Sequence, residues 1–146
     1  MKTIVVAVDF SACTDALIEA AMHSAQKTDK IYVIHIAAPE PDFVGYSVGP
    51  QSVRDARAQQ LLQEHTKLAE YKTALEKAGY DAEALLIPGP TVETLLKQIE
   101  KVEASLLIIG RKGHRPLYEV IIGSVCKAVL NAINIPTLVI PEVTSS

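Results

Sequence analysis

The most informative part of this sequence is the stretch Leu106-Leu107-Ile108-Ile109-Gly110-Arg111-Lys112-Gly113. After nine further residues it is followed by Gly123-Ser124-Val125. An apolar run of strand character leads into a loop with glycines, and the loop leads into a segment, residues 124–131, expected to be helical. Glycine lets a backbone approach a bulky anion, and a helix N-terminus offers unpaired N–H groups and partial positive charge. This order of elements predicts a site for an anion, most often phosphate.

Apolar runs alternate with helical segments along the whole chain. Strands are expected at residues 4–8, 31–36, 82–87, 106–109 and 135–140. Helices are expected from a cap at Ser11 or Thr14 to about residue 28, and at residues 51–78, 91–101 and 124–131. This alternation predicts an α/β fold in which helices cover a parallel sheet, although spacing alone leaves the order of the strands open. The segment from Pro39 to Gln51 holds three prolines and two glycines, and it predicts a long loop that is either a functional flap or a mobile connection.

The composition fits one globular domain over residues 1–146, with 49% apolar residues and a net charge of −3. This charge argues against broad binding to nucleic acid or to anionic lipid. The chain opens with Met1-Lys2-Thr3 and a strand rather than with a secretory signal, and no apolar run reaches transmembrane length. Two cysteines, Cys13 and Cys126, make no disulfide or metal pattern, so we expect a cytoplasmic protein with reduced thiols.

The glycine motif and the apolar strands together resemble the universal stress protein family, in its nucleotide-binding branch. The pattern of that branch is Gly-x2-Gly-x9-Gly-(Ser/Thr), and Gly110, Gly113, Gly123 and Ser124 match every fixed position. The sequences IVVAVDFS at residues 4–11, YVIHI at 32–36 and IPTLVIP at 135–141 are similar to the first, second and last strands of the family. The resemblance covers nearly the whole chain outside the loop from Pro39 to Gln51.

The resemblance implies a three-layer αβα sandwich with a five-stranded parallel sheet of order 3-2-1-4-5, similar to the adenine nucleotide alpha hydrolases. Strands one and four are neighbours in that order, and the chain changes direction across the sheet between them. Ligands of open α/β sheets bind beyond the strand ends at such a point. Asp9 and Gly110 stand at the ends of these two strands, so the expected fold and the glycine motif indicate the same crevice.

The candidate nucleotide-binding residues are Ala7, Asp9, Ile36, Ile109, Gly110, Arg111, Gly113, His114, Gly123, Ser124 and Val125. A carboxylate at the position of Asp9 can accept hydrogen bonds from ribose hydroxyls, or it can cap the following helix. By resemblance, Ile36 matches the position that meets the adenine; the alternative for Ile36, and for Ala7, is ordinary core packing.

The phosphate end of the expected site rests on backbone N–H groups of the glycine motif, including that of Val125, and on the hydroxyl of Ser124. Arg111 and His114 can neutralise phosphate charge, or they can belong to a solvated loop. We expect ATP or ADP as the ligand, with or without Mg²⁺, and no metal held by protein side chains. The usual P-loop and the nucleophile elbow are both absent from the sequence.

The first functional hypothesis is therefore a cytoplasmic stress-response protein that binds an adenine nucleotide as a regulatory ligand. A slow ATPase or phosphotransferase that uses the same cleft is the second, and a dimeric scaffold that needs no nucleotide is the third. The apolar strand Thr137 to Ile140 lies at a sheet edge in the expected order, which invites pairing with another chain. The family resemblance likewise implies a homodimer through this strand, and we expect neither nucleic acid nor a membrane as a partner.

Overall fold

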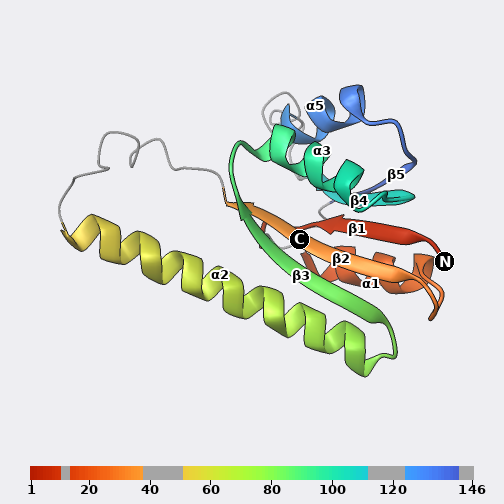
Figure 1. Cartoon of the computed structure of the whole chain (residues 1–146), viewed down its shortest axis with the longest axis horizontal. Coiled ribbons are helices and arrows are strands. Elements are labelled where there is room, and N and C mark those ends of the chain that lie inside the picture. The colour runs from red at the N-terminus through yellow and green to blue at the C-terminus, as the bar shows by residue number, and fades with distance from the viewer. Residues whose placement is uncertain (11–13, 38–50, 112–123, 142–146) are drawn as a thin grey trace, which may run out of the picture.

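The computed structural model describes residues 1–10, 14–37, 51–111 and 124–141 (Figure 1). Its elements are β1 (Thr3–Ala7), α1 (Thr14–Ser24), β2 (Lys30–Ala37), α2 (Gln51–Lys77), β3 (Asp81–Pro88), α3 (Thr91–Lys101), β4 (Leu106–Arg111), α5 (Ser124–Ala132) and β5 (Thr137–Pro141). All of the strands and helices expected from the sequence are present. The largest difference is at α1, which ends at Ser24 rather than near Thr28; the expected loop before Gln51 lies outside the described residues from residue 38 on.

The five strands form one parallel sheet of order β3-β2-β1-β4-β5, as expected. The register places Ala7, the last residue of β1, between Ile34 of β2 and Ile109 of β4. After β1 the chain therefore adds β2 and β3 on one side of β1, and it later adds β4 and β5 on the other side of β1. The C-terminal ends of β1 and β4 are neighbours at this switch point, where α/β folds bind ligands.

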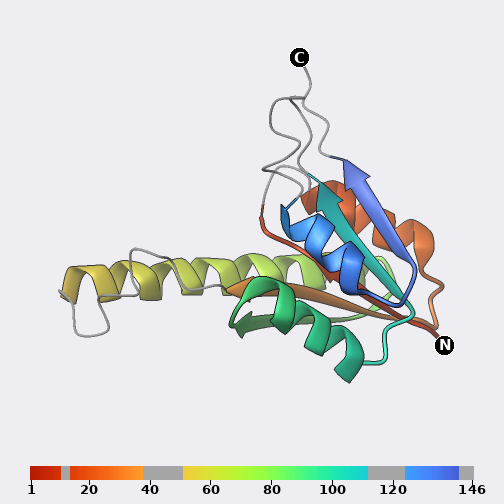
Figure 2. The ribbon, with the colours of Figure 1, turned by 90° about the horizontal axis from the view of Figure 1, so that it is seen from above.

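Two separate cores hold helices on the two faces of the sheet, which makes the fold a three-layer αβα sandwich (Figures 1 and 2). The first core joins the sheet to α1 and α2, and its buried members include Ile4, Val6, Leu17, Val33, Leu68 and Leu75. The second joins the sheet to α3 and α5, and its buried members include Val5, Ile34, Leu95, Leu107, Ile109 and Val129. Neighbouring residues of β1 alternate between the two cores because successive side chains of a strand point to opposite faces.

The C-terminal half of helix α2 packs on the sheet, where Leu68 and Leu75 are buried. Between residues 56 and 67 the side chains are exposed or half-buried, and Figure 2 shows the N-terminal end of the helix projecting beyond the sheet. An ion pair between Lys72 and Glu83, at 3.8 Å, adds a contact between α2 and β3. Although α2 has 27 residues, none of the helices in the described part of the chain is apolar enough to cross a membrane.

The early end of α1 follows from the buried side chain of Asp29. Its carboxylate accepts the backbone N–H of Gln26 at 2.8 Å and that of Lys2 at 2.9 Å. The hydrogen bond from Gln26 uses an N–H that would bond within the helix if α1 were longer. The hydrogen bond from Lys2 connects the turn before β2 to the start of β1. The hydrogen bond from Lys2, followed by that from Gln26, holds the pKa of Asp29 below its usual value.

We expect Asp29→Ala to lower the melting temperature by several degrees at neutral pH, because two backbone N–H groups lose their acceptor. A carboxylate whose pKa is lowered by folding stabilises the protein above its unfolded pKa, and this contribution disappears as the pH falls through the folded pKa. The melting temperatures of the two proteins, followed by circular dichroism, should therefore converge in acid. Asp81→Ala is the control, since this side chain is 63% exposed and its ion pair with Lys30 contributes little. A difference between wild type and Asp29→Ala that stayed constant with pH would contradict this assignment.

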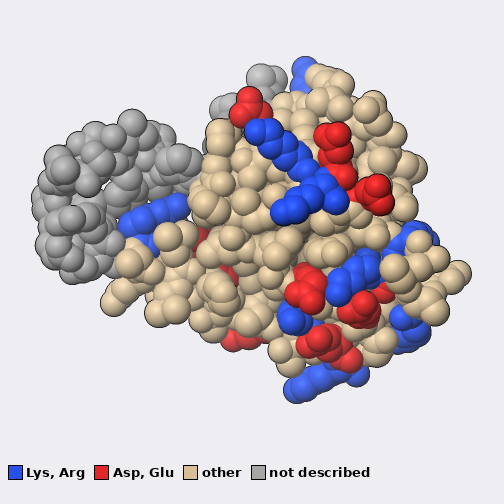
Figure 3. Space-filling view, in the orientation of Figure 1, with Lys and Arg blue, Asp and Glu red and all other residues tan. Residues whose placement is uncertain are grey.

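Acidic and basic side chains are interspersed on the face of the molecule in Figure 3. Lys30, for example, lies 2.9 Å from Asp81 and 3.5 Å from Glu83 across the β2–β3 pair. Opposite charges that neutralise one another at this spacing create little long-range field.

Candidate functional site

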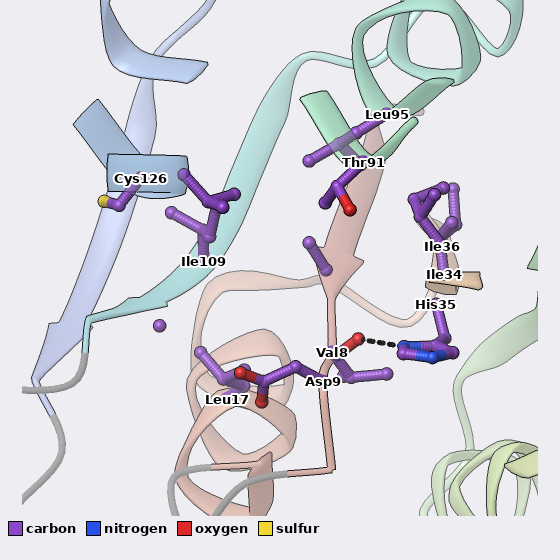
Figure 4. Close-up of a pocket in the computed structure, with 13 residues that line it drawn as sticks. Val8, Asp9, Leu17, Ile34, His35, Ile36, Thr91, Leu95, Ile109 and Cys126 are labelled. Carbon is purple, nitrogen blue, oxygen red and sulfur yellow. Dashed lines mark hydrogen bonds between the residues drawn. The ribbon is translucent and has the colours of Figure 1, made fainter. Parts of the chain in front are cut away.

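A cavity of about 470 Å³ opens at the switch point, beyond the C-terminal ends of β1 and β4 and beside the end of β2 (Figure 4). Its lining residues are Ala7, Val8, Asp9, Leu17, Ile34, His35, Ile36, Thr91, Leu95, Ile109, Gly110, Val125 and Cys126. They come from both faces of the sheet and from the first turns of α3 and α5. Its size and its apolar wall with few polar groups are typical of a small-molecule site.

Six of the predicted site residues line this cavity: Ala7, Asp9, Ile36, Ile109, Gly110 and Val125. Two other predicted residues are next to lining residues in the sequence. Arg111, the last residue of β4, follows Gly110, and Ser124, the first residue of α5, precedes Val125. Gly113, His114 and Gly123 lie outside the described residues. The fold thus brings together residues as far apart in the sequence as Ala7 and Val125.

The cavity has two chemically different ends. Around Ile36 and Leu95 the wall is apolar, which suits a flat aromatic ring. At the other end, Val125 and Cys126 belong to the first turn of α5, where backbone N–H groups are unpaired within the helix and the helix dipole is positive. This end suits an anion, and the exposed carboxylate of Asp9 lies at the end of β1 between them.

Ile36 packs in the second core, where its side chain is 8% exposed, and it also lines the cavity. Its contact with an adenine stays a prediction. Cys126 is buried, while Cys13 lies outside the described residues. His35 is a hydrogen-bonded residue at the rim of the cavity, and its Nδ1 lies 2.8 Å from the carbonyl oxygen of Val8.

Sequence reasoning missed the contribution of α3, whose residues Thr91 and Leu95 line the cavity. A usable signal was present: α3 starts three residues after the end of β3, and a helix that follows a parallel strand starts at the C-terminal edge of the sheet. Leu17 of α1 was missed as well, and its apolar spacing in the helix indicates only that it is buried. Neither signal identifies which helices come close enough to a given strand end to line a cavity.

Comparison with known proteins identifies the family. The model of the universal stress protein family matches residues 1–141. This chain belongs to the universal stress protein family. Universal stress protein MJ0531 of Methanocaldococcus jannaschii is 28% identical over 147 residues, which cover 97% of this chain and 82% of the relative. Universal stress protein Slr1230 of Synechocystis is 36% identical over 64 residues, but this match covers 44% of the chain and 22% of the relative.

Solved structures of universal stress proteins share the fold. The structure of MJ0577 from M. jannaschii has a TM-score of 0.83 at 21% identity, and the match covers 99% of this chain and 98% of that one. A universal stress protein in complex with cAMP matches with a TM-score of 0.67 at 22% identity over 96% of each chain. A family member from Arabidopsis thaliana with AMP bound matches with a TM-score of 0.69 at 17% identity, over 98% of this chain and 93% of its own.

Proposed function

We propose that this universal stress protein binds an adenine nucleotide, ATP or ADP, as a regulatory ligand in the cytoplasm during the stress response. The observation that carries the proposal is the cavity at the switch point, which has an apolar end, a carboxylate and the N-terminus of α5. The ligands of the structural neighbours, cAMP and AMP, belong to the same chemical class and support it.

In the proposed complex the adenine lies against Ile36 and Leu95, and the ribose hydroxyls donate hydrogen bonds to Asp9. The phosphates lie at the N-terminus of α5, held by backbone N–H groups of Val125 and of the glycine motif that begins at Gly110. The unpaired N–H groups and the dipole of α5 favour a negatively charged ligand there. An assay of ATP hydrolysis under single-turnover conditions separates a binding protein from a slow ATPase.

We also propose that the protein is a homodimer through β5. This strand is at the edge of the sheet, beside β4 alone, and its Leu138 is 38% exposed. An exposed apolar edge strand favours pairing with another chain, and two copies can satisfy each other's edges under two-fold symmetry.

We expect Asp9→Ala to weaken AMP binding about tenfold or more, because the ribose hydroxyls lose a charged acceptor. Binding is measured by calorimetry on protein freed of co-purified nucleotide. Free adenine has no ribose, so its affinity should stay the same in the variant. The matched control is Asp15→Ala, which removes an exposed carboxylate of α1 that does not line the cavity. Equal AMP affinity of Asp9→Ala and wild type would rule out the ribose contact.

A further inference from the structure

The turn that carries Asp9 is held in an unusual backbone conformation. Phe10, the next residue, has a φ of 62°, in the left-handed region that a bulky side chain rarely adopts. Such a conformation persists only where surrounding contacts hold it. The position of Asp9, and therefore the shape of the candidate site, depends on these contacts.

His35 of β2 supplies contacts to both neighbours of Asp9. Its Nδ1 lies 2.8 Å from the carbonyl oxygen of Val8, and its ring packs on the ring of Phe10 with the centroids 4.6 Å apart. The backbone N–H of Val8 also donates to the carbonyl oxygen of Ile34 at 2.9 Å. Figure 4 shows the Val8 carbonyl directed toward His35 and the Asp9 carboxylate on the other side of the chain, toward Leu17.

Helix α2 completes this arrangement. Glu64 places its Oε2 3.0 Å from Nε2 of His35, and the two side chains are only 15% and 13% exposed. Lys67, one turn further along α2, has its ammonium 5.7 Å from the centre of the Phe10 ring. A single helix thus contacts both the histidine and the aromatic ring that fix the turn.

The hydrogen-bond chemistry assigns a proton to this pair. A carbonyl oxygen can only accept, so Nδ1 of His35 carries the hydrogen that binds Val8. Nε2 then faces a carboxylate oxygen, and the two can hydrogen-bond only if one further proton lies between His35 and Glu64. The other oxygen of Glu64, Oε1, is buried and has no hydrogen-bond partner among the described residues, so this carboxylate makes its contact through Oε2 to His35.

We propose that Glu64 and His35 are positioning residues, through which α2 sets the geometry of the Val8–Phe10 turn and the nucleotide affinity of the cavity. This inference rests on the proposed function for its ligand, but the link from α2 to the turn stands on the contacts themselves. The contact between Glu64 and His35 joins α2 to β2, and His35 in turn contacts both neighbours of Asp9 in the turn. A change in the position of α2 acts on the site by the same path.

Neighbouring elements place both charged and apolar side chains near the pair. Lys67 lies on the same helix, over Phe10, and Asp9 follows β1 with its carboxylate directed away from His35. On β3, the residue in register with His35 is the apolar Leu86. The contact between His35 and Glu64 thus joins α2 directly to β2 at this point.

The test compares Glu64→Ala, Glu64→Gln and Lys72→Ala with wild type, using AMP as the probe. Glutamine can accept from the charged imidazole or donate to the neutral one, so it keeps the link without the shared proton. Lys72→Ala removes another contact of α2 with the sheet, away from the cavity. Calorimetry gives the AMP affinity of each protein, and amide hydrogen exchange of Val8, whose N–H donates to the carbonyl oxygen of Ile34, is measured by NMR without nucleotide.

We expect Glu64→Ala to weaken AMP binding about tenfold and to speed exchange at Val8, whereas Lys72→Ala changes neither. Glu64→Gln, which keeps a hydrogen bond to His35, should bind AMP like wild type. Unchanged exchange at Val8 in Glu64→Ala would overturn the inference, and so would a Glu64→Gln protein that binds AMP as weakly as Glu64→Ala. If wild type does not bind AMP, the proposed function fails, and the exchange measurement alone decides on the link between α2 and the turn.

Discussion

Replacing Ala7 with phenylalanine is expected to abolish nucleotide binding and to leave the protein folded. Ala7 is the last residue of β1, half-buried, and lies in register between Ile34 and Ile109 at the wall of the cavity. A phenyl ring at this position occupies the space of the ligand, and the empty cavity accommodates it without displacing the core. The affinity for AMP, measured by calorimetry, should fall more than about a hundredfold.

Ala7→Ser is the control, because it changes the polarity of the side chain at this position but adds only one atom. Its affinity should stay close to that of wild type. Thermal unfolding by circular dichroism checks that the phenylalanine variant is folded. A folded Ala7→Phe protein that binds AMP as tightly as the parent would mean that the ligand binds elsewhere.

Val139→Pro is expected to convert the proposed dimer into monomers. The backbone N–H of Leu107 in β4 donates to the carbonyl oxygen of Pro136, so the polar groups of residue 136 face β4. Since these groups alternate along a strand, those of Leu138 also face β4, whereas those of Thr137 and Val139 face outward. Pro141 is outward-facing as well but has no N–H, so Thr137 and Val139 supply the outward N–H groups of β5.

Proline at residue 139 removes one of these two donors without removing an N–H that faces β4. We expect dissociation at micromolar concentration, measured by sedimentation or light scattering. Val139→Thr is the matched control, because it keeps both the N–H and the shape of the side chain, which packs against the second core. A wild-type protein that is monomeric at this concentration, or a folded Val139→Pro protein that remains dimeric, would contradict the proposed interface.

Local patterns in the sequence were sufficient to predict the strands and helices of this fold. Short β-branched runs such as residues 4–8 and 31–36 became strands with ends shifted by one residue, because their apolar side chains need burial on both faces of a sheet. The C-terminal limit of α1 was wrong because the bond from Gln26 to Asp29 is a turn contact that helical propensity does not report. The strand order was predicted through the resemblance to a family and is confirmed by the sheet.

The sequence by itself determined the alternation of strands and helices, the position of the glycine motif after the fourth strand, and the residues at the strand ends. These features depend on neighbouring residues, whose periodicity and turn chemistry are local. Only the tertiary structure decided that Thr91 and Leu95 join Ile36 at one cavity, and that Glu64 reaches His35 from 29 positions further along the chain. Such contacts depend on how each helix crosses the sheet and on the register of the strands, and this geometry is set by the packing of both cores together.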